Sequence, residues 1–416
     1  SFCHRCNLLI RISDILSDTS QFTCDGCGYT IGIVDDDSIM SSHNALAPSG
    51  FTVNSADEHK KKYGHIKSGD GISDGFVDAS PRTGGVTGLF HPDSESDVIQ
   101  FADKNLDVKI HPEGEILRIN RGWDKQGFSL KQPGFWPASG GEESNSNVWL
   151  LDENGESDRW LLMAPRITEV LRIGHAEKKA GILMDVLENS TSRGRISTSR
   201  VKAAFYSAAF LIQRVFSDYQ DIDPNELGVG QVRRRMQMSD GKVGAEIIIF
   251  DNNSNNGSGF SSLLGENLEN ILDRCLDPSL STYLSSILSD DHRAKCRSSC
   301  YRCIKGYSNT AYHGLMDWRL GMSIIRLMTD NEYDCGLSKD HDFSEYPEMR
   351  DFPQISESAA NELRTSQAIP EDWETVKVGA LHGLVNRDEK EAILIIHPLW
   401  DVGDIEFDSR LDIALL

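Results

Sequence analysis

The sequence lacks the motifs by which an ATP hydrolase holds its nucleotide. Neither a GxxxxGK(S/T) phosphate-binding loop nor a DExH box occurs in its 416 residues. No Ser/His/Asp, Cys/His or paired-carboxylate arrangement stands out from chance spacing, so we name no catalytic residue. Whether this chain is itself an enzyme therefore stays open, and any ATP on which it depends would be hydrolysed by a motor outside it.

Long apolar segments and a secretion signal are absent too. No apolar run approaches the roughly 18 residues that a membrane-spanning helix needs, and the longest, near Ile393–Ile396, is typical of a buried strand. We therefore expect a cytoplasmic chain without membrane contact. The chain opens on Ser1 without a methionine and ends on the apolar Ala414–Leu416. We expect these ends to be cuts within a larger polypeptide, or limits of the resolved part.

Basic residues are scarce. The chain has 42 Lys and Arg against 64 Asp and Glu, which gives a net charge of −22 at pH 7. Phosphate backbones are repelled by a surface of that sign, so any contact with DNA has to be local. The acidic surface either keeps the chain in solution or faces a protein partner.

Sequence texture predicts an α+β protein with four parts. These are a zinc ribbon (1–45), a β-rich middle with loops (46–164), a mixed α/β zinc-binding domain (165–330) and an acidic C-terminal region with a strand (331–416). The clearest helix is expected over Arg200–Tyr219, where apolar residues recur every three to four positions. We expect further helices over Leu263–Leu272, Ser279–Leu288 and Gly314–Thr329, and strands over Ala180–Leu187, Ala245–Phe250 and Ala392–Ile396.

Eight of the nine cysteines fall into two sets of four. In the first set, two CxxC pairs stand 17 residues apart: Cys3 and Cys6, then Cys24 and Cys27. Each pair can turn two thiolates toward one tetrahedral zinc ion, and two such turns on short strands make a zinc ribbon. With no secretion signal, metal binding is favoured over disulfides.

The second set is more compact. Cys296, Cys300 and Cys303 lie within eight residues, and Cys275 stands 21 residues before the first of them. Four sulfur ligands form a closed, structural zinc site. Cys335 is the alternative fourth ligand, and an iron–sulfur or redox role is the alternative chemistry. The sequence thus predicts two zinc ions in the whole chain.

Basic and aromatic side chains cluster at the second cysteine set. DNA could bind there through charge and base stacking, although the same charges could pair with acidic neighbours or stabilise the thiolates. The candidate contacts are Arg293, Lys295, Arg297, Tyr301, Arg302 and Lys305, with Tyr307 beside them and Arg233–Arg235 as a second basic run. The Asn- and Gly-rich stretch Asp251–Phe260 could offer backbone N–H groups to a phosphate, or be a tight surface turn.

An ordered series of motifs resembles the MZB-type zinc-binding domain, over about residues 165–330. The series consists of Phe205–Arg214, Asp221–Glu226, Glu246–Asp251, Asn256–Phe260, Cys275, the cysteine triplet, Tyr307–His313 and Leu315–Arg319. That domain ends many bacterial superfamily-two DNA helicases and occurs in DISARM- and Druantia-like phage-defence proteins. The family tends to show Gly-Gly-x-Gly where this chain has Asn256-Gly257-Ser258-Gly259, a departure that weakens any single task for the loop.

The resemblance implies a four-cysteine zinc site at Cys275, Cys296, Cys300 and Cys303, beside an ATP-driven motor acting on DNA. We therefore expect an accessory zinc-binding region of a DNA helicase or translocase, in bacterial antiviral defence. Its partners would be the motor, in cis or in trans, DNA, and subunits of a defence complex. The alternative is a stand-alone adaptor that docks a separate helicase without touching DNA.

Overall fold

The computed structural model describes part of the chain. The described residues are 2–3, 21–23, 30–32, 40–41, 44–46, 85–89, 97–100, 106–120, 128–131, 150–152, 159–175, 180–184, 195–236, 243–252, 258–338, 343–366, 369–370 and 372–401. They form a mixed α+β structure, as the sequence predicts. Within them, every helix is too short or too polar to span a bilayer.

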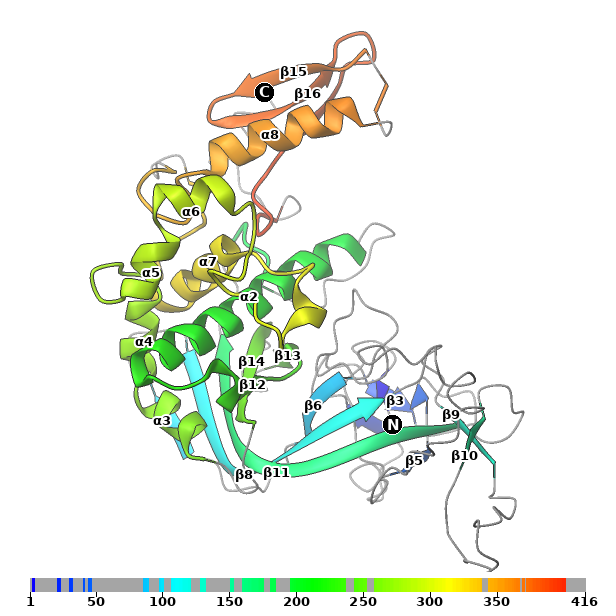
Figure 1. Cartoon of the computed structure of the whole chain (residues 1–416). Helices are drawn as coiled ribbons and strands as arrows, with labels where there is room; N and C mark the ends of the chain where they lie inside the picture. The colour runs from blue at the N-terminus through cyan, green and yellow to red at the C-terminus, as the bar shows by residue number, and fades with distance from the viewer. Residues whose placement is uncertain are drawn as a thin grey trace, which may run out of the picture.

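A ten-stranded sheet is the base of the molecule. Its two longest strands, β8 (Leu106–Asn120) and β11 (Arg159–His175), pair antiparallel, and β14 (Val243–Asp251) pairs with the other edge of β11. Figure 1 shows β11 as one long curved ribbon. The domain boundary expected between residues 164 and 165 falls inside β11, so one sheet joins the predicted middle to the predicted zinc-binding domain.

Shorter strands complete this sheet and two small ones. The remaining members of the main sheet are β5 (Asn44–Leu46), β6 (Gly85–Leu89), β7 (Asp97–Gln100), β9 (Phe128–Lys131), β10 (Leu150–Asp152), β12 (Leu227–Val229) and β13 (Arg233–Met236). The small pairs are β1 (Phe2–Cys3) with β4 (Met40–Ser41), and β2 (Gln21–Thr23) with β3 (Thr30–Gly32).

The side chains of β11 and β14 point alternately to the two faces of the sheet, and they contribute to a different apolar cluster on each face. Leu171 pairs with Ile249 and Ile173 with Ile247, and these four side chains belong to the main core. Val170, Ile248 and Phe250 point to the other face with Ile116, where they form a smaller cluster. Successive strand residues face opposite sides of a sheet, so β11 and β14 are covered on both faces where they pair with each other.

Two helices lie over the main core. The predicted helix over Arg200–Tyr219 is confirmed as α2 (Arg195–Gln220), and α7 (Trp318–Thr329) packs against it. A Cβ on Gly321 would lie 2.8 Å from the backbone carbon of Ser207, so the two helices approach at a distance that only glycine allows. The helix expected from Gly314 begins at Trp318, because Asp317 caps it by accepting from the Arg319 N–H (2.9 Å).

Short helices follow β14. The helix expected over Leu263–Leu272 is two helices, α3 (Phe260–Glu266) and α4 (Leu268–Arg274), which meet at Asn267. Next come α5 (Thr282–Ile287) and α6 (Asp290–Lys295). Ser281 and Ser289 cap them through their side chains. The short 3-10 turns are η2 (Pro224–Glu226) and η3 (Thr310–Tyr312).

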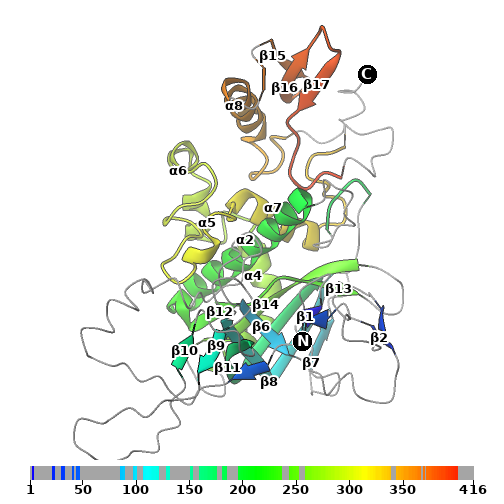
Figure 2. The same ribbon diagram turned by 90° about the vertical axis from the view of Figure 1, so that its right-hand side faces the viewer.

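The C-terminal part carries more structure than the single strand expected there. It contains α8 (Phe352–Thr365) and a three-stranded antiparallel sheet of β15 (Glu374–Val378), β16 (Leu381–Asn386) and β17 (Glu391–Leu394). Figures 1 and 2 both place it beyond α6 and α7, away from the main sheet.

The chain returns from this part to the core. Trp400 is buried and forms an isolated bridge with Ile182, and its indole N–H donates to the Cys335 carbonyl (3.2 Å). The strand expected over Ala180–Leu187 is therefore only a single bridge within residues 180–184, because its partner is one returning residue and not a neighbouring strand.

Candidate metal centre

Four side chains converge at the end of α6. The ligand atoms of His292, Cys296, Cys300 and Cys303 lie within 4.8 Å of one another. His292 and Cys296 are one helical turn apart, and the Cys296 N–H donates to the His292 carbonyl (2.8 Å). The other two cysteines follow in the next turn of the chain. One short segment thus supplies all four candidate ligands.

The spacing of these atoms suits a tetrahedral ion. Zinc–sulfur bonds of about 2.3 Å at tetrahedral angles separate two sulfurs by about 3.8 Å. The Cys303 Sγ lies 3.9 Å from the Cys296 Sγ and 3.8 Å from the Cys300 Sγ. The Cys300 Sγ lies 3.4 Å from the His292 Nε2, and the shorter zinc–nitrogen bond makes that edge shorter. The separations are those of ligands around one zinc-sized ion.

The imidazole of His292 is held in a metal-binding orientation. Its Nδ1 lies 2.7 Å from the Ile287 carbonyl oxygen, which can only accept a hydrogen bond. The proton is therefore placed on Nδ1, and Nε2 presents its lone pair toward the thiols. A backbone carbonyl commonly fixes the ring of a metal-binding histidine in this way. The side chain is buried, with 1% exposure.

Thiolate formation is favoured at Cys303. A hydrogen bond from the Cys296 thiol, aided by the N–H groups of Cys300 and Ile304 against the effect of burial, lowers the pKa of the Cys303 thiol. The Cys300 N–H lies 3.0 Å from its sulfur. Metals bind thiolates and not thiols, so these hydrogen bonds favour the form of Cys303 that can bind a metal.

The expected fourth ligand, Cys275, is not part of this group, and His292 stands in its place. Cys275 caps the end of α4 and is fully buried, and desolvation raises the pKa of its thiol. An apolar, thiol-protonating environment is that of a core cysteine. Cys335, the alternative, is also buried outside the group. The spacing His292-x3-Cys296 was the signal that would have identified the histidine.

The first predicted zinc site lies outside the described residues. Of Cys3, Cys6, Cys24 and Cys27, only Cys3 falls in a described strand, β1, and nothing is known there of its side chain. The zinc ribbon stays a prediction.

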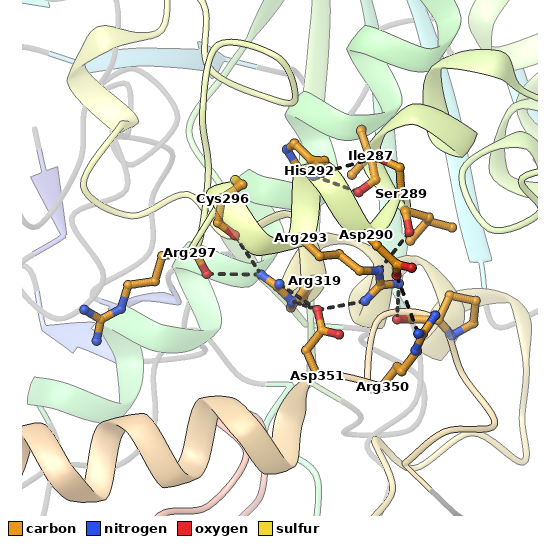
Figure 3. A network of polar contacts seen from close by, with 12 residues as sticks. Ile287, Ser289, Asp290, His292, Arg293, Cys296, Arg297, Arg319, Arg350 and Asp351 are labelled. Carbon is orange, nitrogen blue, oxygen red and sulfur yellow. Dashed lines mark hydrogen bonds and ion pairs between the residues drawn. The ribbon is translucent and has the colours of Figure 1, made fainter.

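Most of the candidate DNA-contacting cations are engaged in ion pairs. The guanidinium of Arg293 is 7% exposed and donates to Asp351 (2.8 Å) and to the Pro347 carbonyl (2.7 Å). Figure 3 shows it pointing inward with Arg319 toward Asp351. Arg297 pairs with Glu362 (2.6 Å). The positive charge expected at a DNA surface is therefore largely balanced by acidic neighbours.

Two further cations share one carboxylate. Lys295 pairs with Asp291, and Arg302 donates to the other oxygen of Asp291 (3.0 Å). Hydrogen bonds from Lys295 and Arg302 lower the pKa of Asp291. For Arg233–Arg235, the backbone pairs with β14 as β13, and nothing is known of the side chains.

Two exposed tyrosines lie in and just after the cysteine loop, Tyr301 between Cys300 and Cys303 and Tyr307 beyond them. Tyr301 and Tyr307 are 68% and 94% exposed. Between them the chain is held tightly, because Asn309 accepts from the Gly306 N–H (2.7 Å) and donates to the Ile304 carbonyl (2.9 Å). The ring of Tyr301 lies edge-on to His313. An ordered turn thus presents both aromatic rings to solvent, on either side of Lys305.

In the described part of Asp251–Phe260, the backbone N–H groups from Ser258 onward are hydrogen-bonded to the chain itself. One carboxylate oxygen of Asp251 accepts from the N–H groups of Ser258 (2.5 Å), Gly259 (2.8 Å) and Phe260 (3.3 Å). The other accepts from the N–H and hydroxyl of Ser261 (2.8 and 2.6 Å). At these described residues the Asp251 carboxylate takes the position that a phosphate would need, which favours the tight turn over a phosphate site.

The sequence matches no family model and no curated protein. Among solved structures, the crystal structure of the DUF1998 helicase MrfA bound to DNA is similar with a TM-score of 0.32 and 11% identity. The likeness covers 60% of this chain and 25% of that chain. The matched part thus spans a quarter of the length of that chain, and a likeness of this size establishes neither fold nor activity.

Proposed function

We propose that His292, Cys296, Cys300 and Cys303 hold one structural zinc ion. The observation that carries this proposal is the set of 3.4–3.9 Å separations between ligand atoms, with the His292 Nδ1 proton directed at a carbonyl. Four protein ligands leave no position for water or substrate, which distinguishes a structural from a catalytic zinc. A second zinc ion would occupy the N-terminal cysteine set.

The zinc-binding region would serve a DNA helicase or translocase as an accessory part that braces the motor. Support comes from the ordered motifs shared with the MZB-type domain, with His292 in place of the family's fourth cysteine. The motor would lie on the same polypeptide or on a partner, and cytoplasmic antiviral defence would be the setting. The alternative is an adaptor that docks a separate helicase without DNA contact. The ion pairs formed by the surface arginines support this alternative.

Direct DNA contact would be concentrated at Tyr301, Lys305 and Tyr307. Both rings are exposed, and within the described residues no ion pair involves Lys305. Aromatic rings beside a cation can stack on the bases of a single strand. The paired Lys295, Arg297 and Arg302 would contribute less, because each would first have to leave its carboxylate.

Metal content tests the zinc proposal. Protein purified without added metal should carry two zinc ions per chain by plasma emission spectrometry. His292→Ala and Cys300→Ser should each lower this to one, whereas Cys275→Ser, a matched control at a buried cysteine outside the group, should leave two. Retention of two ions by His292→Ala together with loss of one in Cys275→Ser would restore the four-cysteine assignment and reject the present one.

A further inference from the structure

A half-buried carboxylate joins the candidate metal-binding segment to the C-terminal part. Asp351 immediately precedes α8, and its Oδ2 accepts from the Arg293 Nη1 (2.8 Å) and from the Arg319 Nη2 (2.8 Å). The two arginine side chains are 7% and 9% exposed. Figure 3 shows both guanidinium groups converging on this one side chain.

Each arginine also donates hydrogen bonds to backbone carbonyls in or beside the candidate metal-binding segment. Arg293 is the neighbour of His292, and its Nε donates to the Leu288 carbonyl (2.9 Å) at the start of α6. From α7, the Arg319 Nη1 donates to the carbonyl of Arg297 (3.1 Å) and approaches that of Cys296 (3.5 Å). The carbonyls of two successive residues, Cys296 and Arg297, thus face a side chain that Asp351 holds.

Neighbouring contacts fix the same segment against α7. The Trp318 N–H donates to the Ser298 carbonyl (3.0 Å), and the Trp318 ring packs against the imidazole of His292 at 5.8 Å. The guanidinium of Arg319 lies over that indole ring at 4.3 Å. A shift of Arg319 would therefore be felt at two candidate ligands, His292 and Cys296.

We infer that Asp351, acting through Arg293 and Arg319, positions the metal ligands and couples metal binding to the docking of residues 343–366. This inference rests on the proposed zinc site. Asp351 is the carboxylate that both buried arginines share, and removing one partner of a buried ion pair leaves uncompensated charge. The arginines would then be drawn toward solvent, and the carbonyls that they orient would be released.

Coupling of this kind is reciprocal. If loss of the Asp351 contact weakens zinc binding by some factor, loss of zinc must weaken the docking of α8 by the same factor. Substitution of groups that orient metal ligands commonly lowers metal affinity 10- to 100-fold. We expect an effect of about that size at this site, although Asp351 touches no ligand atom.

The test uses the full chain and a zinc chelator of known affinity. Asp351→Asn should weaken zinc binding at the second site about 10- to 100-fold. Glu348→Gln is the matched control, because Glu348, three residues away, forms an ion pair with Arg326 (2.6 Å) that is also shielded from solvent and does not touch the metal segment. It should lower the melting temperature while leaving zinc affinity near the parent value. Arg319→Lys keeps the charge beside Asp351 but removes the guanidinium, which donates to Asp351 and to the backbone carbonyls at the same time. This variant should weaken zinc binding as well.

Hydrogen exchange supplies the reciprocal measurement on the parent chain. Removal of zinc should accelerate exchange in 343–366 while β8, β11 and β14 keep their protection. The inference is overturned if exchange in 343–366 is unchanged by zinc removal, or if folded Asp351→Asn and Arg319→Lys bind zinc as tightly as the parent. A parent chain that holds no zinc at His292 and the three cysteines would instead reject the proposed site.

Discussion

Two loops of this protein were candidates for binding an ion, and their polar groups are arranged in opposite ways. After α6, three sulfurs and one imidazole nitrogen face one another at ligand distances. After β14, the backbone N–H groups face a carboxylate that the chain itself supplies, that of Asp251. The comparison teaches that a cluster of hydrogen-bond donors, or of metal-binding atoms, indicates an external ligand only when no group of the chain itself already binds to it. The following predictions test this distinction.

Loss of a metal ligand should have the largest effect. Structural zinc in small domains contributes roughly 10–16 kcal/mol of apparent binding free energy, and that energy stabilises the folded state. Cys300→Ser should therefore lower the melting temperature in calorimetry more than any other substitution considered, and added chelator should produce the same loss in the parent. Equal melting temperatures with and without chelator would contradict a structural ion.

Asp251→Ala should have the next largest effect. The substitution leaves several buried or half-buried N–H groups and the Ser261 hydroxyl without their acceptor, at about 1–3 kcal/mol for each group that water cannot reach. We expect urea denaturation to show a loss of about 2–4 kcal/mol. The exposed cap Asp223→Ala, which removes one hydrogen bond to the Asn225 N–H, is the control and should cost about 1 kcal/mol.

Asp251→Ala should also convert the second loop into one that can bind an external anion. With the carboxylate gone, the vacated N–H groups resemble an anion site, so inorganic phosphate should stabilise Asp251→Ala while leaving the parent unchanged. Thermal melts over a phosphate titration, matched in ionic strength with chloride, would measure this. A parent that gains as much stability from phosphate as the variant would show that the loop was never filled.

Acid should act at a third place, outside both loops. Burial, with a smaller contribution from Arg200, lowers the pKa of His397 from 6.5 to about 3. Its lowered pKa means that the unfolded chain takes up a proton below pH 6.5 while the folded chain does not. Stability is thus full above pH 6.5 and falls as the pH drops toward 3, by about 1.4 kcal/mol at pH 5.5.

A substitution separates this loss from protonation of the metal ligands. His397→Gln should be less stable than the parent at pH 7.5. Between pH 7.5 and 5.5, its free energy of unfolding, measured by urea denaturation, should fall less than that of the parent, because the histidine contribution is missing. An identical decline in both proteins would assign the acid sensitivity elsewhere.

The smallest effect on stability is expected at the exposed aromatics. Tyr307→Ala should change the free energy of unfolding by less than about 0.5 kcal/mol, because the ring is 94% exposed. If the proposed DNA contact exists, binding of single strands by the motor complex should weaken by about 1–3 kcal/mol. Arg297→Ala, which removes a cation paired with Glu362, is the matched control. A larger loss for Arg297→Ala than for Tyr307→Ala would return the contact to the basic residues.

Sequence alone was sufficient where the determining contacts are local. Three members of the candidate metal site could be named because Cys296, Cys300 and Cys303 lie within eight residues, a span in which the backbone can turn all three sulfurs to one point. Helix α2 and strand β14 followed from the periodicity of their apolar residues, because each periodicity reports one buried face or a continuous buried run.

Tertiary structure decided between alternatives that the sequence left open. Cys275 and His292 were both chemically able to complete the site, and the fold buries the first in an apolar core while the Ile287 carbonyl orients the second. The arginines beside the ligands carry the charge of a DNA surface, yet Asp351, 58 residues after Arg293, turns that one inward. Composition fixes how many charges a chain has, but only the fold brings a particular carboxylate close enough to neutralise a particular arginine.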